Sequence, residues 1–304
     1  MSNPSASESG DIVDVDIRAW VEAAINDPLR YRDRQMTEIV LSTIGIAPNL
    51  GASLILKGGT LMALAFGSQR LTGDIDFTAD VEPGDFDQDL TQELNALLPK
   101  TAIQLGYLDL VCRVQSIKKM PRSENFEDHS FPALLVRIGS AMRRTPEERA
   151  LALGRAPRVV QVEISFRDQV YTSQSLLLSG GGAAVRAFTL HEIIAEKLRA
   201  LLQQPIRKRY RRQDVYDIAF LLDGRALDDD DRKLIHQTLI DKCATRDIHP
   251  DFFSMENPEV IRRAQADWDT LKLEVSDLPS FEERYAIVLD FYKSLSWPAA
   301  NQSA

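Results

Sequence analysis

Residues 53–80 constrain the fold of this chain more than any other stretch, because their pattern is that of a strand, a glycine turn, a helix, a polar turn and a second strand. The first strand ends at Lys57, and the helix begins at Gly58-Gly59-Thr60. Backbone N–H groups at the start of a helix are free to bind phosphate. The stretch therefore predicts a phosphate-binding turn.

The second strand of this stretch carries two carboxylates on one face. Alternate side chains of a strand share a face, so Asp74 and Asp76 point the same way while Ile75 and Phe77 point into the core. Adjacent carboxylates repel each other unless a cation or a proton lies between them, and hard oxygen ligands suit Mg²⁺. The pattern predicts a Mg²⁺–nucleotide site, with a solvated acidic strand face as the alternative interpretation.

A third carboxylate interrupts an otherwise apolar strand. Residues 158–166 are rich in β-branched side chains, which predicts a central strand, and Glu163 is its one acidic residue. Such a residue needs a partner, because an unpaired buried charge is costly. Together with Asp74 and Asp76, Glu163 would complete a site for two divalent ions roughly 3.5–4 Å apart.

Composition indicates a globular protein and places bounds on its location. Of the 304 residues, 44% are hydrophobic and 27% are charged. The sequence contains no run of 18 apolar residues, so it predicts no transmembrane helix. The first ten residues lack the pattern of a secretory signal. Cys112 and Cys243 lie far apart and in no metal-binding spacing, which fits packing residues in a reducing cytoplasm.

A short basic segment stands out against a net charge of −9, which argues against a nonspecific nucleic-acid coat. Five cations surround Tyr210, and they are Arg207, Lys208, Arg209, Arg211 and Arg212. Backbone contacts combined with stacking on an aromatic ring are a common mode of RNA binding. The segment predicts an RNA-binding rim, with a solvated helix end as the alternative.

Gly180-Gly181-Gly182 marks a change from mixed to helical patterns. We predict a disordered leader over residues 1–10, an α+β domain over 11–180, a helical domain over 184–298 and a disordered tail over 299–304. The first domain is expected to contain helices over 14–46 separated at Pro28, a helix over 90–98 that ends before Pro99, strands over 107–117, 131–138 and 158–166, and a polar hairpin loop over 118–130. The second is expected to contain a helix from the capping-box residue Thr189 that ends or kinks at Pro205, then helices over 213–222, 228–241, 258–272 and 281–292.

Several short motifs occur together and in a characteristic order. They are Lys57-Gly58-Gly59-Thr60, Arg70, Asp74-Ile75-Asp76-Phe77, Glu163, residues 196–201 (Glu-Lys-Leu-Arg-Ala-Leu) and residues 214–218 (Asp-Val-Tyr-Asp-Ile). Over roughly residues 35–225 the chain resembles the AbiEii/AbiGii family, which are nucleotidyltransferase toxins of bacterial abortive-infection and toxin–antitoxin systems in the DNA polymerase β-like superfamily. The resemblance implies an α+β fold, in which a mixed β-sheet palm with flanking helices is followed by a C-terminal helical domain.

The resemblance also implies roles for the residues of the first domain. Asp74, Asp76 and Glu163 would bind Mg²⁺. The turn at Gly58, Gly59 and Thr60 would hold the β and γ phosphates of an NTP. Lys57 would pair with phosphate, unless it is an ordinary lysine at the end of a strand. Arg70 would reach the nucleotide or brace Asp76, unless it is an exposed loop residue.

Two further roles fall in the helical domain. Lys197 would lie in the cleft against the triphosphate, unless it extends its ammonium group to solvent. Asp214 would pair with Lys197 or Arg199, or position the base or the acceptor, and Asp217 is a candidate partner for a nearby arginine. Family members often have arginine immediately before this first aspartate, where this chain has Gln213.

The implied reaction is transfer of a nucleoside monophosphate from an NTP to an RNA acceptor, most simply a tRNA 3′ end, which would block translation during phage defence. The implied partner is a cognate antitoxin, often a winged-helix repressor. Two alternatives remain, an enzyme that nucleotidylates a protein or a small molecule and a noncatalytic binding module. The clustered carboxylates argue against the module, because a scaffold has no need of such charges. The oligomeric state has no sequence signal.

Overall fold

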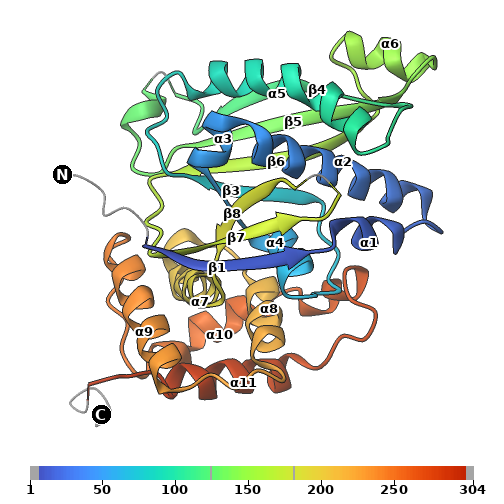
Figure 1. Ribbon diagram of the computed structural model, residues 1–304. Helices are drawn as coiled ribbons and strands as arrows, with labels where there is room; N and C mark the ends of the chain where they lie inside the picture. Colours follow the sequence, from blue (N-terminus) through green and yellow to red (C-terminus); the bar gives the residue numbers. More distant parts are fainter. Residues whose placement is uncertain (1–6, 124, 181, 299–304) are drawn as a thin grey trace.

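The computed structural model describes residues 7–123, 125–180 and 182–298. Within these residues, eight strands form one mixed sheet in the order β1-β7-β8-β2-β3-β6-β5-β4 (Figure 1). The strands are β1 (Ser7–Val15), β2 (Leu54–Lys57), β3 (Asp74–Ala79), β4 (Leu110–Met120), β5 (Ala133–Met142), β6 (Arg158–Phe166), β7 (Thr172–Leu178) and β8 (Ala184–Phe188). The predicted α+β fold with a mixed-sheet palm is confirmed.

Strand pairing brings the predicted site residues together at the centre of the sheet. β2 and β3 are antiparallel, with Lys57 opposite Asp76. β3 and β6 are parallel, with Asp76 opposite Glu163. β6 also pairs with β5, in antiparallel fashion, so it lies between two strands and is the central strand that its composition predicts.

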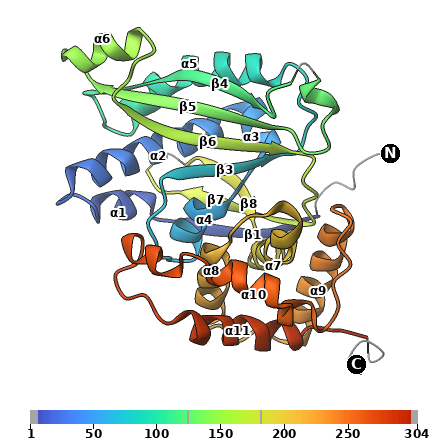
Figure 2. The same ribbon diagram turned by 180° about the vertical axis from the view of Figure 1, so that it is seen from behind.

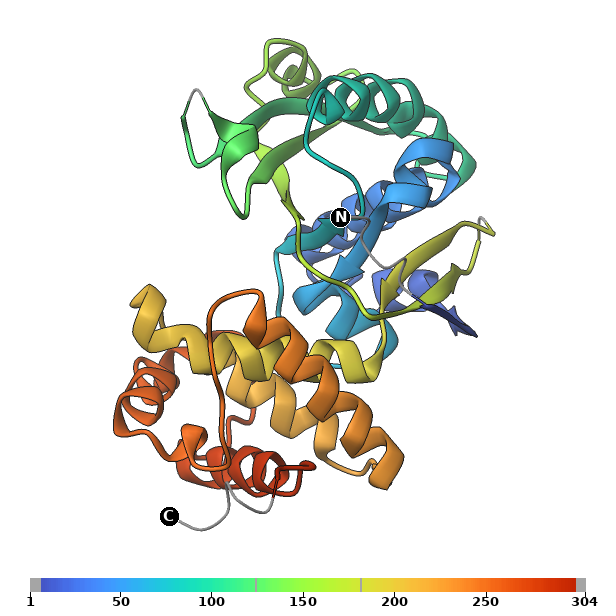
Figure 3. The same ribbon diagram turned by 90° about the vertical axis from the view of Figure 1, so that its left-hand side faces the viewer.

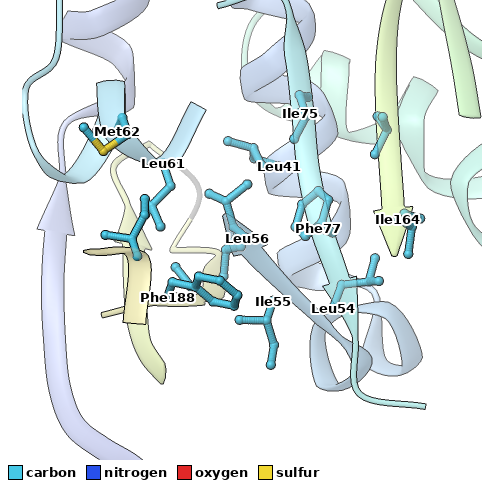
Figure 4. Close-up of a cluster of buried hydrophobic side chains, with 14 of the residues drawn as sticks. Leu41, Leu54, Ile55, Leu56, Leu61, Met62, Ile75, Phe77, Ile164 and Phe188 are labelled. Atoms are coloured by element: carbon cyan, nitrogen blue, oxygen red, sulfur yellow. The ribbon is translucent and has the colours of Figure 1, made fainter. Parts of the chain in front are cut away.

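Helices cover one face of the sheet, from β8 and β2 across to β4. They are α2 (Pro28–Ile46), α3 (Pro48–Ser53) and α5 (Phe86–Gln104), with α1 (Ile17–Glu22), α4 (Gly58–Ala65) and α6 (Pro146–Ala152) beside them. Figure 2 shows β5 and β6 in front of these helices, with no helix drawn over their middle. Figure 4 shows the core at the centre of this packing, formed by Leu41, Leu54, Leu56, Ile75, Phe77 and Ile164. The opposite face of these strands is therefore left open.

The C-terminal part of the chain is helical and forms a separate layer (Figure 3). It comprises α7 (Leu190–Arg207), α8 (Arg212–Leu222), α9 (Asp229–Ala244), α10 (Pro258–Gln265) and α11 (Phe281–Lys293), with short 3-10 turns at Ser254–Glu256 and Trp268–Leu273. The Thr189 hydroxyl accepts a hydrogen bond from the Glu192 N–H, which confirms the predicted start of α7. Together α7, α8 and α9 pack side by side beneath the sheet.

Three predicted element boundaries are wrong. α5 runs through Pro99 to Gln104, because Leu98, Thr101 and Ala102 keep the second half of the helix buried against the sheet. β4 continues to Met120, where a loop from residue 118 was expected, since it stays paired with β5. The helix expected over 258–272 breaks near residue 267, whose backbone is left-handed.

The ends of the two domains also differ from expectation. Residues 7–10 of the expected leader belong to β1, which pairs with β7, while residues 1–6 and 299–304 lie outside the described residues. Residues 184–188 form β8 of the sheet, so the helical layer begins at α7. None of the helices in the described ranges is long and apolar enough to cross a membrane.

Candidate functional site

A cavity of about 880 Å³ lies between the open side of the sheet and the helical layer. The predicted site residues that line it are Lys57, Gly58, Asp76, Glu163, Lys197, Arg207, Arg209, Arg211 and Asp214. The predicted residues outside its lining are Gly59, Thr60, Arg70, Asp74, Lys208 and Arg212. The sheet thus supplies carboxylates and one lysine, and the helical layer supplies most of the cations.

The three predicted metal-binding carboxylates lie on the same side of two paired strands. Asp76 on β3 stands opposite Glu163 on β6, and Asp74 precedes Asp76 by two residues. Burial raises the pKa of Asp74, and the neighbouring charge of Asp76 raises it further. Burial also raises the pKa of Asp76, although Lys57 and Lys197 act against it, and burial together with Asp76 raises that of Glu163. The negative charges of these carboxylates therefore repel one another, and a bound cation would reduce that repulsion.

The spacing of these side chains also bears on whether they could bind a metal ion. In the part of the chain that the structure describes, no group of three or more His, Cys, Asp or Glu side chains has the spacing needed to hold a metal ion. The donor set still suits a hard divalent cation, because it consists of carboxylate oxygens whose mutual repulsion a cation would relieve. The assignment of Asp74, Asp76 and Glu163 as ligands therefore stays a prediction.

The glycine turn owes its sequence to the close approach of β3. Gly58 has φ +70°, and a Cβ atom there would lie 2.0 Å from Oδ2 of Asp76. A Cβ atom on Gly59 would lie 2.6 Å from Oγ1 of Thr72. The Thr60 hydroxyl is buried and donates to the Asp74 carbonyl over 2.8 Å, so it braces β3 and is not free to contact phosphate. Any phosphate bound here would use backbone N–H groups.

Lys57 is held on the sheet side of the cavity. Its Nζ donates to Oγ of Ser165 over 2.7 Å and to Oδ2 of Asp168 over 2.9 Å. Arg246, from the segment after α9, donates to the other oxygen of Asp168. Burial would raise the pKa of Asp168, but Lys57 and Arg246 hold it well below its usual range. This bridge between the two layers was missed, because neither Asp168 nor Arg246 lies in a motif.

Lys197 lies between two carboxylates of α8. Its Nζ is 2.8 Å from Oδ1 of Asp214 and 2.8 Å from Oδ2 of Asp217. The contact predicted between Lys197 and Asp214 is confirmed. Burial would lower the pKa of Lys197, but the two carboxylates outweigh it and raise the pKa, so the residue keeps its charge.

Arg70 does not take the position expected of it. Its guanidinium donates to both carboxylate oxygens of Asp217, over 2.9 and 3.1 Å, and to Glu274 over 2.7 Å. It neither lines the cavity nor hydrogen-bonds Asp76, because its partners in the helical layer hold it beneath the turn. The prediction that Asp217 pairs with an arginine is confirmed, whereas the nucleotide contact predicted for Arg70 has no support here.

The basic segment follows the end of α7 and borders the cavity. Arg207, Lys208 and Arg209 are exposed, and Lys208 caps α7 with a left-handed φ of 52°. Arg211 lies 3.9 Å from Asp214, and the charge of Arg209 acts to lower the pKa of Glu163. Three of the five predicted RNA-binding cations thus face the cavity, while Lys208 and Arg212 lie outside its lining.

A second buried ion network supports the cavity wall and was also missed. Glu196 on α7 pairs with Arg199 and with Lys242 of α9, which lies 3.4 Å away. Lys242 also lies 2.7 Å from Glu192. Burial would raise the pKa of Glu196, but the two cations lower it to about 2. Glu196 belongs to the motif at residues 196–201, yet its pairing with Lys242 depends on the packing of α7 against α9.

Comparison with known proteins identifies the family. A family model described as "Nucleotidyl transferase AbiEii toxin, Type IV TA system" matches residues 40–287. The chain belongs to this family. It is therefore a nucleotidyltransferase toxin of a type IV toxin–antitoxin system, with an antitoxin as partner and, as for its family generally, an NTP substrate and a divalent metal. The resemblance noted in the sequence is confirmed.

The solved structure of one nucleotidyltransferase toxin supports the same fold. MenT4, a nucleotidyltransferase toxin from Mycobacterium tuberculosis H37Rv, is similar with a TM-score of 0.53 and 17% identity, over 94% of this AbiEii-family chain and 91% of that one. JHP933 from Helicobacter pylori is similar with a TM-score of 0.49 and 16% identity, over 90% of this chain and 91% of that one. No curated protein sequence matches the chain.

Proposed function

We propose that this AbiEii-family protein transfers a nucleoside monophosphate from an NTP to the 3′ end of a tRNA, with Mg²⁺ held by Asp74, Asp76 and Glu163. The observation that carries the proposal is the division of one cavity into two walls. Asp76 and Glu163 stand side by side on the sheet, and Lys197 with the basic segment faces them from the helices. Such a cavity suits a nucleotide substrate bound with a metal ion, because carboxylates can hold the metal and the facing cations can hold the phosphates.

In the proposed reaction the terminal hydroxyl of the acceptor gives up its proton to solvent water and attacks the α-phosphorus of the NTP. The bond from that phosphorus to the bridging oxygen of the β-phosphate breaks, and pyrophosphate leaves. Bound metal would lower the pKa of the attacking hydroxyl and offset phosphate charge. Lys57 and Lys197 would stabilise the negative charge that develops on the leaving group, which is where phosphoryl-transfer catalysis gains most. Asp214 would position Lys197, which it contacts directly.

The basic segment supports RNA as the acceptor. Arg207 and Arg209 are exposed, line the cavity and make no side-chain ion pair with any residue in the described ranges. An acidic protein that keeps such cations unpaired beside its carboxylates is suited to hold a phosphate backbone there. Lys208 and Arg212 would extend this rim. Modified tRNA ends would halt translation in the cytoplasm, and the proposed antitoxin is a winged-helix repressor.

The test is incubation of the protein with each α-labelled NTP, Mg²⁺ and total tRNA, followed by sequencing of the tRNA 3′ ends. We expect added nucleotides with the wild type and a loss of about 10²-fold or more with Glu163→Gln. Asp89→Asn is the matched control, because Asp89 is exposed on α5 away from the cavity. Label on protein or on a small molecule, with none on RNA, would overturn the tRNA assignment.

A further inference from the structure

The open face of the sheet continues beyond the cavity in two ordered rows of side chains. Strand register places Asp76, Glu163, Leu135 and Lys118 in one row across β3, β6, β5 and β4. It places Asp74, Gln161, Arg137 and Ser116 in the neighbouring row. Each row thus begins at a proposed metal ligand and contains one cation on the outer strands.

The two cations in these rows are free to bind an anion. Lys118 and Arg137 are exposed, and neither makes an ion pair or a side-chain hydrogen bond with a residue that the structure describes. Helices α2, α3 and α5 lie on the other face (Figure 2). Strand register places Lys118 and Arg137 on the same side of the sheet as Glu163 and Gln161, which line the cavity.

The spacing of the rows fits a chain of phosphates that leads into the cavity. Neighbouring strands lie about 4.8 Å apart, so Lys118 is about 10 Å from Glu163, and Arg137 is about 10 Å from Asp74. The half-buried Leu135 lies between Lys118 and Glu163, and Met120, which is 43% exposed, lies in the next row; both line the cavity. Apolar side chains beside cations suit a single-stranded nucleic acid, whose bases and sugars need contacts as well as its phosphates.

We propose that this surface, formed by Lys118, Arg137, Met120 and Leu135, binds the single-stranded RNA segment that immediately precedes the 3′ acceptor nucleotide. The strand then lies between this surface and the basic segment at the end of α7, with its last hydroxyl at Asp76 and Glu163. The inference rests on the proposed function, because it assigns a path to the RNA that the proposed function requires. Charge complementarity favours RNA over a protein segment, which is treated as an outcome of the test.

The test measures binding of fluorescently labelled tRNA by anisotropy between 50 and 200 mM salt, with Lys118→Gln, Arg137→Gln and the double variant. Each phosphate contact to a single strand contributes about 0.7 to the slope of log affinity against log salt. We therefore expect the slope to become shallower by about 0.7 for each single variant and about 1.4 for the double. At 0.1 M salt this corresponds to a loss of about 5-fold for each single variant and about 25-fold for the double.

Lys100→Gln is the matched control, because Lys100 is equally exposed and unpaired among the described residues but lies on α5, which covers the other face. It should change tRNA affinity less than about 2-fold. Stabilisation of the double variant by NTP in a thermal shift assay should equal that of the wild type, which shows that the nucleotide site is intact.

Three outcomes would count against the surface, and they are distinguishable from failure of the proposed function. An unchanged salt slope in the double variant, with a wild type that still modifies tRNA, overturns the surface alone. Equal losses in Lys100→Gln and Lys118→Gln overturn it as well. Loss of affinity for purified antitoxin with unchanged tRNA binding assigns the surface to the antitoxin. A wild type that modifies no RNA overturns the proposed function itself.

Discussion

Replacement of Asp217 by asparagine tests how the two layers of the molecule are held together. Asp217 has no exposed surface and accepts hydrogen bonds from Arg70 of the sheet domain and from Lys197 of α7. Asparagine keeps the shape but removes the charge. Arg70 would then keep only Glu274, and Lys197 would keep only Asp214.

The expected cost is large because two buried cations lose a partner together. Removal of one member of a buried ion pair typically costs about 3–5 kcal/mol. An unfolding entropy of about 2.1 cal/mol/K per residue over the whole chain converts this into a fall in melting temperature of about 5–8 °C. Burial would raise the pKa of Asp217, but Lys197 and Arg70 lower it below its ordinary value of 3.8. The stabilisation is therefore complete at neutral pH and is lost as pH falls below 3.8.

The assay is thermal and denaturant unfolding of Asp217→Asn beside Asp214→Asn at pH 7. Asp214 contacts the same lysine but does not contact Arg70, so Asp214→Asn should cost clearly less stability and more activity. The difference between the two variants should shrink when Arg70 is also changed to glutamine. An Asp217→Asn variant as stable as Asp214→Asn would refute the reasoning that Arg70 ties the layers together through Asp217.

Three further predictions concern the turn, the metal and the second ion network. Gly58→Ala should abolish transfer activity and lower the free energy of unfolding by about 1–3 kcal/mol, because its Cβ would lie 2.0 Å from Oδ2 of Asp76. Gly73→Ala is the control for the same unfolding and transfer assays. It should be tolerated, because no atom beyond its chain neighbours lies within 4 Å of a Cβ at that position. Mg²⁺ at 100 times its Kd should stabilise the wild type by about 2.7 kcal/mol in a thermal shift assay, and Asp76→Asn should lose this response while matching or exceeding the stability of the metal-free wild type. Glu196→Gln should make the free energy of unfolding depend less on pH in acid. The pKa of Glu196 falls from 4.5 to about 2 on folding, so its contribution to stability is complete above pH 4.5 and is lost as pH falls to about 2. The loss over that range is about 3 kcal/mol. An equal fall in the stability of wild type and Glu196→Gln over that pH range would contradict this assignment.

The sequence predicted the parts of the site that depend on local pattern. Asp76 and Glu163 are acidic residues in otherwise apolar strands, and such exceptions are visible without any structure. Their adjacency is a different matter, because it depends on the parallel pairing of β3 with β6, whose residues are far apart in the chain. Motif order made the pairing plausible, but only the sheet order places the two carboxylates opposite each other.

The errors arise where a side chain finds its partner in the other layer. Arg70 lies in the polar turn just before the acidic strand, which favours a nucleotide contact, yet its partners lie 147 and 204 residues further along the chain. Asp168 and Arg246 were missed for the same reason, because they are far apart in the sequence and form their ion pair only in the folded structure. Pro99 was read as a helix end, but burial on both sides of it outweighs the hydrogen bond that proline lacks.

The order of strands in the sheet also bears on how the protein is made. Synthesis proceeds from the N-terminus at about 5–20 residues per second, and domains fold as their residues emerge. β1 pairs with β7, and β3 pairs with β6, which is synthesised much later. Asp74 and Asp76 therefore leave the ribosome long before Glu163. Arg70 acquires its last partner only with Glu274. We therefore expect a nascent chain of this toxin to stay inert until the helical layer, through Glu274, has been synthesised.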